Sequence, residues 1–221
     1  MIMKKILAFR GSPRKNGNSS ILLESFVNGV SANKCDTEII DVYDLNLKYC
    51  SGCLRCNILQ RCSVSDDDWQ VISKKIEESD VLVFSSPIYF HHVPAALKKI
   101  IDRFRSFANV QITETGLNHT PWKIWNKDFV LLLTMGSSDI KDAKPVTELF
   151  EFITSILGEN NNLHIITATR LALAKQINKN EKELSELYQK MELPVKLAIR
   201  DYSTNKNILK QCYELGIKLS K

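Results

Sequence analysis

Long hydrophobic runs, blocks of like charge and internal repeats are all missing from this sequence of 221 residues. No apolar stretch approaches the roughly 20 residues of a membrane-spanning helix. The first apolar run stops at Arg10, too early for a secretion signal. The net charge of +5 is spread along the chain, unlike the concentrated basic stripe of nucleic-acid-binding proteins. We therefore expect a cytoplasmic protein that binds neither membranes nor nucleic acids.

The composition, 44% hydrophobic and 25% charged, is typical of a globular protein. No stretch reads as a domain linker, so residues 1–221 are expected to form a single domain. Residues 43–65 are expected to be a cysteine-bearing loop, and residues from about 170 to 221 a C-terminal helical extension. The six cysteines of a cytoplasmic protein are expected to be reduced, metal-bound or redox-active rather than paired in structural disulfides.

Short apolar runs alternate with segments of helical periodicity, which predicts an α/β fold. The expected strands lie near 3–9, 37–42, 80–86, 129–134 and 163–168. The expected helices lie near 18–33, from 66, after Pro94, from Pro145 and in the last third, and a polar and aromatic connection covers 109–127. We expect a doubly wound, five-stranded parallel sheet with helices on both faces and strand order 2-1-3-4-5.

The loop after the first strand, residues 11–20, reads Gly-Ser-Pro-Arg-Lys-Asn-Gly-Asn-Ser-Ser. It leads into a helix, whose N-terminus favours an anion. Gly17 permits a tight turn, and the candidate phosphate-binding residues are Ser12, Arg14, Asn18, Ser19 and Ser20. The loop matches neither of the common nucleotide-binding glycine motifs. It is therefore either a cradle for a single phosphate or an ordinary connection.

Four cysteines form the closely spaced pattern Cys50-x-x-Cys53-x-x-Cys56-x5-Cys62. Four thiolates suit an iron–sulfur cluster, and they also suit tetrahedral zinc. Unligated or redox-active thiols are the third interpretation. Cys35 and Cys212 lie in other segments and are expected to be buried as small hydrophobic residues.

The loop at 11–19, the four-cysteine spacing and the stretch Ser-Pro-Ile-Tyr-Phe at 86–90 occur in the order seen in one known family. Together they resemble the NAD(P)H-dependent FMN reductases and iron–sulfur flavoproteins, over about the first 135 residues. The resemblance implies a flavodoxin-like fold, bound FMN and NAD(P)H as co-substrate. It also implies a homodimer or homotetramer.

The resemblance further implies where the flavin lies. Its phosphate would be held by the loop at 11–20. Its ring would be held by two later loops, through Pro87, Ile88, Tyr89 and Phe90 and through Thr134, Met135 and Gly136. His91 and His92 replace the small residues usual in relatives, and they either contact the site or are plain loop residues. No side chain is nominated as a catalytic acid, base or nucleophile, because the cofactor carries the redox chemistry.

We therefore expect an FMN-dependent oxidoreductase, NAD(P)H-dependent, that passes electrons to a small-molecule acceptor. Free flavin, a quinone, a nitroaromatic compound or a protein all remain open as acceptor. One alternative is an electron carrier with FMN and a 4Fe–4S cluster on Cys50, Cys53, Cys56 and Cys62, serving a protein partner such as ferredoxin. The other is a non-enzymatic, zinc-stabilised binding module of the same fold.

Overall fold

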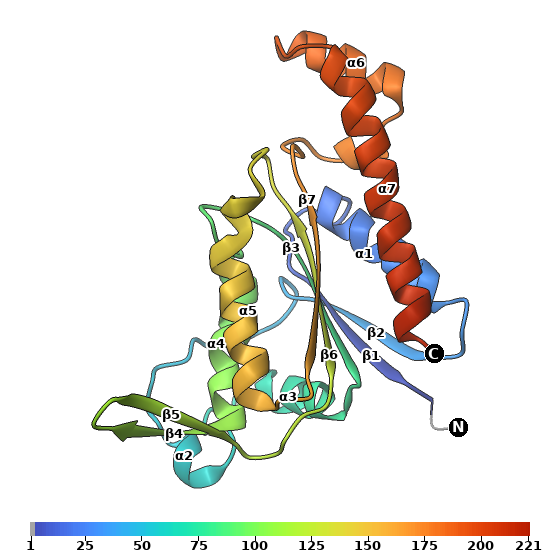
Figure 1. The fold of residues 1–221 in the computed structure, drawn as a ribbon. Coiled ribbons are helices and arrows are strands. Elements are labelled where there is room, and N and C mark those ends of the chain that lie inside the picture. Colours follow the sequence, from blue (N-terminus) through green and yellow to red (C-terminus); the bar gives the residue numbers. More distant parts are fainter. Residues whose placement is uncertain (1–2) are drawn as a thin grey trace.

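Five parallel strands form the central sheet of the computed structural model, which describes residues 3–221. They are β1 (Lys5–Arg10), β2 (Asp36–Asp41), β3 (Val81–Pro87), β6 (Asp128–Thr134) and β7 (Asn162–Ala168). Their order is β2-β1-β3-β6-β7, with every neighbouring pair parallel (Figure 1). The fourth and fifth strands of the sheet are thus the sixth and seventh of the chain, because a hairpin absent from the sequence prediction precedes them.

Helices cover both faces of the sheet, as the sequence predicts (Figure 1). One face packs against α3 (Trp69–Glu78), α4 (Ala95–Arg103) and α5 (Lys144–Leu157). The other face packs against α1 (Asn18–Val30) and α7 (Lys196–Leu219). The alternation of side chains along a strand divides the strand residues between the two cores. In β1, Leu7 and Phe9 enter the first core, whereas Ile6 and Ala8 enter the second.

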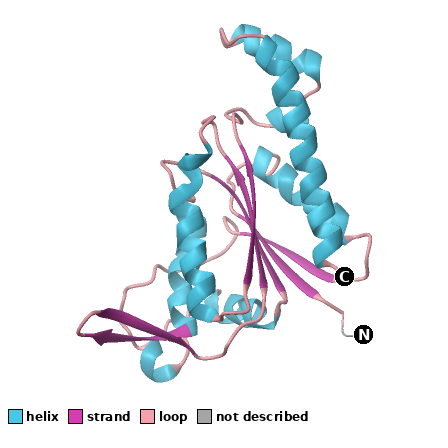
Figure 2. Cartoon of the chain, viewed as in Figure 1, coloured by secondary structure: helices cyan, strands magenta, loops and turns pink. Residues whose placement is uncertain are grey.

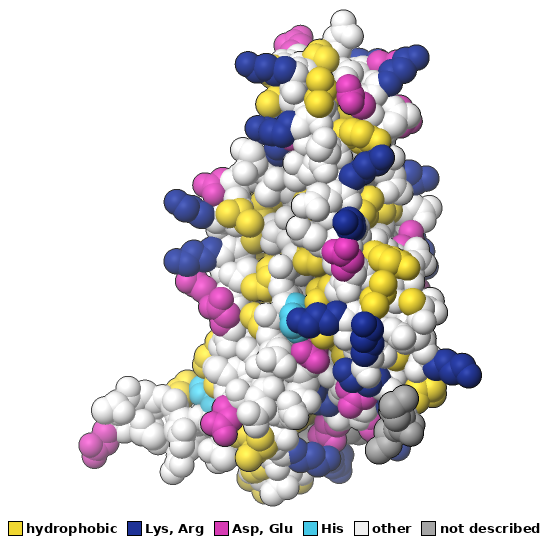
Figure 3. Space-filling model, turned by 45° about the vertical axis from the view of Figure 1, so that its right-hand side comes forward, with side chains coloured by type: hydrophobic (Ala, Val, Ile, Leu, Met, Phe, Trp, Pro, Cys, Tyr) yellow, Lys and Arg dark blue, Asp and Glu magenta, His cyan; other side chains and the backbone are white. Residues whose placement is uncertain are grey.

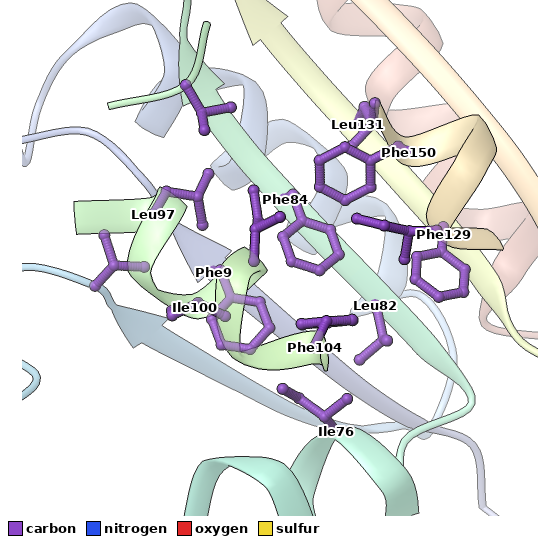
Figure 4. Close-up of a cluster of buried hydrophobic side chains, with 14 of the residues drawn as sticks. Phe9, Ile76, Leu82, Phe84, Leu97, Ile100, Phe104, Phe129, Leu131 and Phe150 are labelled. Atoms are coloured by element: carbon purple, nitrogen blue, oxygen red, sulfur yellow. The ribbon is translucent and has the colours of Figure 1, made fainter. Parts of the chain in front are cut away.

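Phenylalanine rings fill the centre of the first core (Figure 4). The ring of Phe84 on β3 lies 4.8 Å from that of Phe150 on α5 and 5.2 Å from that of Phe9 on β1, measured between centroids. Phe129 on β6 stacks on it at 6.4 Å. All four rings are fully buried, so three strands and a helix share one aromatic contact layer. This layer fixes the relative positions of the strands that carry the candidate site.

On the opposite face, α1 and α7 cross at two glycines. A Cβ atom on Gly29 would lie 2.0 Å from the carbonyl oxygen of Tyr213, and one on Gly216 would lie 2.1 Å from that of Phe26. Only glycine allows the two backbones to approach so closely. The C-terminal helix is therefore packed tightly against the first helix of the chain.

The connection expected over 109–127 is instead largely an antiparallel hairpin, β4 (Ala108–Thr113) and β5 (Gly116–Pro121), which lies apart from the main sheet (Figure 2). The prediction was wrong because most side chains of this hairpin are exposed or only half-buried. Ile112 and Leu117 pair across the two strands and are both exposed. There is thus no alternation of core-facing apolar residues for the sequence to reveal.

The helix expected from residue 66 begins at Trp69. The carboxylate of Asp67 accepts hydrogen bonds from the Trp69 and Lys48 backbones and from Arg103, so this residue ties a loop to α4 instead of opening the helix. The remaining short elements and the extension are α2 (Cys56–Leu59), η1 (Phe104–Phe107), η2 (Ile140–Ala143), η3 (Gln176–Asn178) and α6 (Glu181–Lys190).

Charge is dispersed over the surface, as expected. On the face drawn in Figure 3, Lys and Arg side chains are spread along the whole length of the molecule, with Asp and Glu among them. Within residues 3–221, no helix combines the length and the apolar character needed to cross a bilayer.

Candidate functional site

Three loops meet at the carboxyl edge of the sheet, after β1, β3 and β6. Because these strands are neighbours, their exits lie side by side. The Ser19 hydroxyl lies 3.0 Å from the hydroxyl of Thr134, which joins the first loop to the third. The backbone N–H of Ile88 donates to the carbonyl of Thr134 at 2.8 Å, which joins the second loop to the third. The structure thus brings together the three stretches that the sequence singled out.

The first loop is folded around the backbone carbonyl of Arg14. This oxygen accepts from the Gly17 N–H at 2.8 Å and from the hydroxyl of Ser20 at 3.2 Å, and Ser12 Oγ accepts from the Arg14 N–H. A Cβ atom on Gly17 would lie 3.1 Å from that carbonyl, so the turn leaves little room for a side chain there. The three serines of the loop are buried, whereas the side chain of Arg14 is exposed.

Helix α1 begins directly after this turn, at Asn18. The backbone N–H groups of Asn18, Ser19 and Ser20 are the first three of the helix, and such groups have no acceptor within a helix. Together with the helix dipole they favour an anion at this point. The hydroxyls of Ser12 and Ser19 lie around the same turn, so together with these N–H groups they suit a phosphate monoester, whereas the Ser20 hydroxyl donates to the Arg14 carbonyl and offers only its backbone N–H.

The side chain of Asn18 has a different role from the expected phosphate donation. Its Nδ2 donates to the carbonyls of Leu173 at 2.7 Å and Leu171 at 3.3 Å, and its Oδ1 accepts from the Ile177 N–H. The amide is therefore used to hold the segment after β7 against the start of α1. Only the backbone N–H of Asn18 remains for an anion.

The second loop contains a tight turn with unusual backbone angles. Tyr89 and His92 exchange two backbone hydrogen bonds, at 2.8 and 3.0 Å, and the two residues between them have φ of 47° (Phe90) and 61° (His91). Two successive left-handed residues define the turn type that normally requires Asn and Gly. Phe90 is fully exposed, Tyr89 is exposed and Ile88 packs against the first core. Strain of this kind clusters at functional sites.

The two histidines of this loop lie in different surroundings. His91 is exposed, and its Nδ1 lies 3.7 Å from a carboxylate oxygen of Asp142 on η2, so the second and third loops also meet through their side chains. Burial lowers the pKa of His92.

The third loop is largely committed to internal contacts. Met135 is buried in the first core, its N–H donates to Ala168 and its carbonyl accepts from Leu171. Thr134 is also buried, and its hydroxyl faces Ser19. Gly136 is exposed. Thr134 and Gly136 are thus better placed than Met135 to offer groups to a ligand.

The four cysteines line one pocket, which we call the four-cysteine pocket. Its wall comprises Cys50, Ser51, Gly52, Cys53, Leu54, Cys56, Cys62, Ser63, Val64, Arg103, Arg105 and Ser106. Gly52, Leu54 and Gln60 have left-handed φ angles, which bend the chain repeatedly around it. Cys56 is buried, Cys62 is half-buried, and Cys50 and Cys53 are exposed.

The donor set of this pocket fits a cluster held by four thiolates. Hydrogen bonds from the Arg55 backbone and the Ser63 hydroxyl lower the pKa of Cys53, whereas burial raises that of Cys56. No group of three or more His, Cys, Asp or Glu side chains within residues 3–221 is placed to hold a single metal ion. The other two cysteines are far from the pocket in sequence. Cys212 is fully buried, as expected, and this burial raises its pKa to about 12. The expectation was wrong for Cys35, which is only half-buried because it lies at the edge of the fold, where its thiol donates to the carbonyl of Ser220.

Two arginines of the pocket wall were missed in the sequence. Arg103 is fully buried and makes a two-pronged ion pair with Asp67, at 2.7 and 3.4 Å. Arg105 donates to Cys56 Sγ at 3.6 Å. Arg103 is the last residue of α4 and Arg105 lies in η1 directly after it, whereas the second loop precedes the N-terminal end of α4. The pocket and that loop are therefore separated by the length of a nine-residue helix, about 14 Å.

Comparisons with known proteins agree with these features. The profile of the NADPH-dependent FMN reductase family matches residues 4–161. An iron–sulfur flavoprotein from Methanocaldococcus jannaschii is 36% identical over 101 residues, 46% of this chain and 52% of that protein. The match thus spans about half the length of this relative, as it does for the other curated relatives.

Two solved structures share the fold over nearly the whole chain. One is an NAD(P)H:quinone oxidoreductase from Methanothermobacter marburgensis, which is 17% identical and covers 98% of both chains with a TM-score of 0.63. The other is an FMN-dependent NADH-azoreductase from Bacillus anthracis in complex with FMN. It is 14% identical and covers 99% of this chain and 100% of that one, with a TM-score of 0.62. Because the family profile covers most of the sequence, the chain belongs to the NADPH-dependent FMN reductase family.

Proposed function

We propose that this protein is an FMN-dependent oxidoreductase that takes electrons from NAD(P)H and passes them to a small-molecule acceptor. The observation that carries the proposal is the junction of the three loops. There the Ser19 and Thr134 hydroxyls are hydrogen-bonded beside the N-terminus of α1. Family membership and the activities named for the two structural neighbours support it. A quinone or an azo compound is the acceptor class that those names favour.

The chain's own residues would bind and orient the cofactor. The hydroxyls of Ser12 and Ser19 and the first N–H groups of α1, including that of Ser20, would hold the phosphate, with Arg14 as an exposed cation beside it. Residues 87–90 together with Thr134 and Gly136 would border the ring. Bound FMN supplies the hydride and electron transfer, so no side-chain acid or base is required.

The test is an anaerobic titration of the purified protein with FMN, followed by addition of NADPH or NADH. We expect tight binding of FMN and bleaching of its absorbance by at least one nicotinamide. Ser19→Ala removes one hydrogen bond to a charged group, about 1.5–3 kcal/mol, so FMN affinity should fall by about 10-fold or more. Ser31→Ala, at the exposed end of the same helix segment, is the matched control. An unchanged affinity in the first variant would contradict the proposed phosphate site.

A second candidate is an iron–sulfur flavoprotein that exchanges electrons with a protein such as ferredoxin. It is favoured by the placement of all four cysteines around one pocket and by the names of the curated relatives. Iron and sulfide analysis with a visible spectrum of anaerobically purified protein tests it. FMN reduced by ferredoxin but not by NAD(P)H would favour this carrier, whereas a colourless protein containing zinc would favour a non-enzymatic binding module.

Assembly and location stay predictions. The resemblance to the family favours a homodimer or homotetramer, which light scattering of the purified protein would measure. Cytoplasmic location would be measured by fractionation of cells that express the protein.

A further inference from the structure

The wall of the four-cysteine pocket carries two guanidinium groups with different charge balance. Arg103 is neutralised by Asp67, and both side chains are fully buried. Arg105 donates instead to the carbonyl of Ala108 at 2.7 Å, to Asn57 Oδ1 at 2.8 Å and to Cys56 Sγ at 3.6 Å. No carboxylate lies within ion-pair distance of Arg105 in residues 3–221. One positive charge at the pocket is therefore uncompensated.

The position of Arg105 is fixed by a frame of hydrogen bonds. Asn57, the neighbour of Cys56 on α2, both donates to the carbonyl of Val110 at 2.8 Å and accepts from its N–H at 3.1 Å. This pairing docks α2 onto β4, and Arg105 bridges the two elements. The half-buried guanidinium thus has little freedom to turn away from the sulfur of Cys56.

A second feature of the pocket also points to a ligand. The Nε of Arg103 is buried and has no hydrogen-bond partner, although this side chain is fully buried and lines the pocket. Buried donors without partners are rare in native proteins. A negatively charged group in the pocket would be stabilised by the uncompensated charge of Arg105, and a centre held by four thiolates is such a group.

We propose that Arg105 is the positioning residue of a metal–thiolate centre in the four-cysteine pocket, where it holds Cys56 and stabilises the negative charge of the centre. This inference rests on the second candidate function. A four-thiolate cluster becomes more negative by one charge when it takes up an electron. A fixed guanidinium beside it therefore favours the reduced state and raises the reduction potential.

The experiment compares wild type with Arg105→Gln, Arg105→Lys and the control Arg61→Gln, all reconstituted anaerobically with iron and sulfide. Arg61 is exposed, lies in the loop that carries the four cysteines, and is outside the pocket wall. The readouts are the midpoint potential of the cluster and the rate at which a chelator removes iron. Far-UV circular dichroism and FMN content report whether each variant is folded.

Arg105→Gln should lower the midpoint potential and release iron about 10-fold faster or more, the usual effect of losing a partner of a metal ligand. Arg105→Lys keeps the charge but loses the forked bonds, so its potential should stay near that of wild type while iron is released faster. Arg61→Gln should match wild type. If Arg105→Gln does not fold, faster iron release from Arg105→Lys supports the inference, and an unchanged rate overturns it.

Two further results would overturn the inference in distinguishable ways. If wild type holds a cluster, and Arg105→Gln shows the same potential and the same release rate, the role of Arg105 alone is wrong. If wild type binds FMN but takes up no iron and sulfide, the cluster candidate fails together with this inference, whereas the FMN-dependent oxidoreductase stands.

Discussion

The turn at Phe90 and His91 should cost the protein stability, and replacing it with the residues that its geometry prefers should recover that cost. Both residues adopt left-handed φ angles, and neither is glycine or asparagine. Each such residue costs on the order of 1–3 kcal/mol. Phe90 is fully exposed, so its removal sacrifices no packing within the chain. The double substitution Phe90→Asn/His91→Gly supplies the preferred turn sequence.

The expected gain in the free energy of unfolding is smaller than the sum of the two strain energies. Glycine makes the unfolded chain more flexible, which favours the unfolded state by about 0.4–1 kcal/mol. The exposed contact of His91 with Asp142 contributes little, since exposed pairs are worth about 0–1 kcal/mol. We therefore expect a net stabilisation of about 1–2 kcal/mol. In a chain of this size that corresponds to a rise in Tm of about 2–8 °C.

Urea unfolding of the protein without added FMN is the direct assay. Ile124→Asn is the matched control, because Ile124 is also exposed and apolar but does not have a left-handed φ angle. It should change the free energy of unfolding by less than about 0.5 kcal/mol. A loss of stability in the double variant would refute the argument from strain. If Phe90 borders the ring as proposed, the stabilised variant should also bind FMN more weakly.

Three further predictions concern the rest of the chain. Gly216→Ala would place a methyl group against the Phe26 carbonyl and should lower the free energy of unfolding in urea by about 1–3 kcal/mol or more. Gly136→Ala should cost much less, because a Cβ atom there would lie 3.5 Å from its nearest neighbour, the Cβ of Ala172. Asn18→Ala should cost about 1–3 kcal/mol and increase proteolysis of the segment after β7, because buried carbonyls lose their donors; unchanged proteolysis would contradict that role. Burial raises the pKa of Asp67, but the hydrogen bonds from Arg103, Lys48 and Trp69 outweigh it and hold this pKa below its usual value. The pair therefore stabilises the fold above about pH 4 and loses this contribution as the pH falls through the lowered pKa. Asp67→Asn should cost about 3–5 kcal/mol at pH 7 and flatten the acid limb of the stability curve.

The α/β architecture could be predicted because its signals are local. Buried strands such as β3 are continuous apolar runs, and small-residue loops follow them directly. Neighbouring strand ends then bring Ser19 and Thr134 together, although 115 residues separate them. The location of the three loops follows from topology alone.

The contacts that define individual side chains could not be predicted in this way. The partner of Asn18, the carbonyl of Leu173, lies 155 residues away in a segment without a recognisable motif. Arg103 stands at the end of an amphipathic helix, where charged residues normally face solvent, and only the fold reveals the buried carboxylate opposite it. The hairpin β4–β5 was not predicted, because exposed strands have no alternating pattern of core-facing apolar residues.

The separation of the four-cysteine pocket from the loop junction by the length of α4 has a consequence for how such a protein can change. Substitutions of the cysteines at one end of this helix would leave the turn proposed to hold the phosphate, at the other end, untouched. A protein of this fold could therefore keep the proposed flavin site whether or not the four-cysteine pocket holds an inorganic centre. The four cysteines lie within one loop, so the chemistry of this pocket can be changed without altering the strands that carry the loop junction.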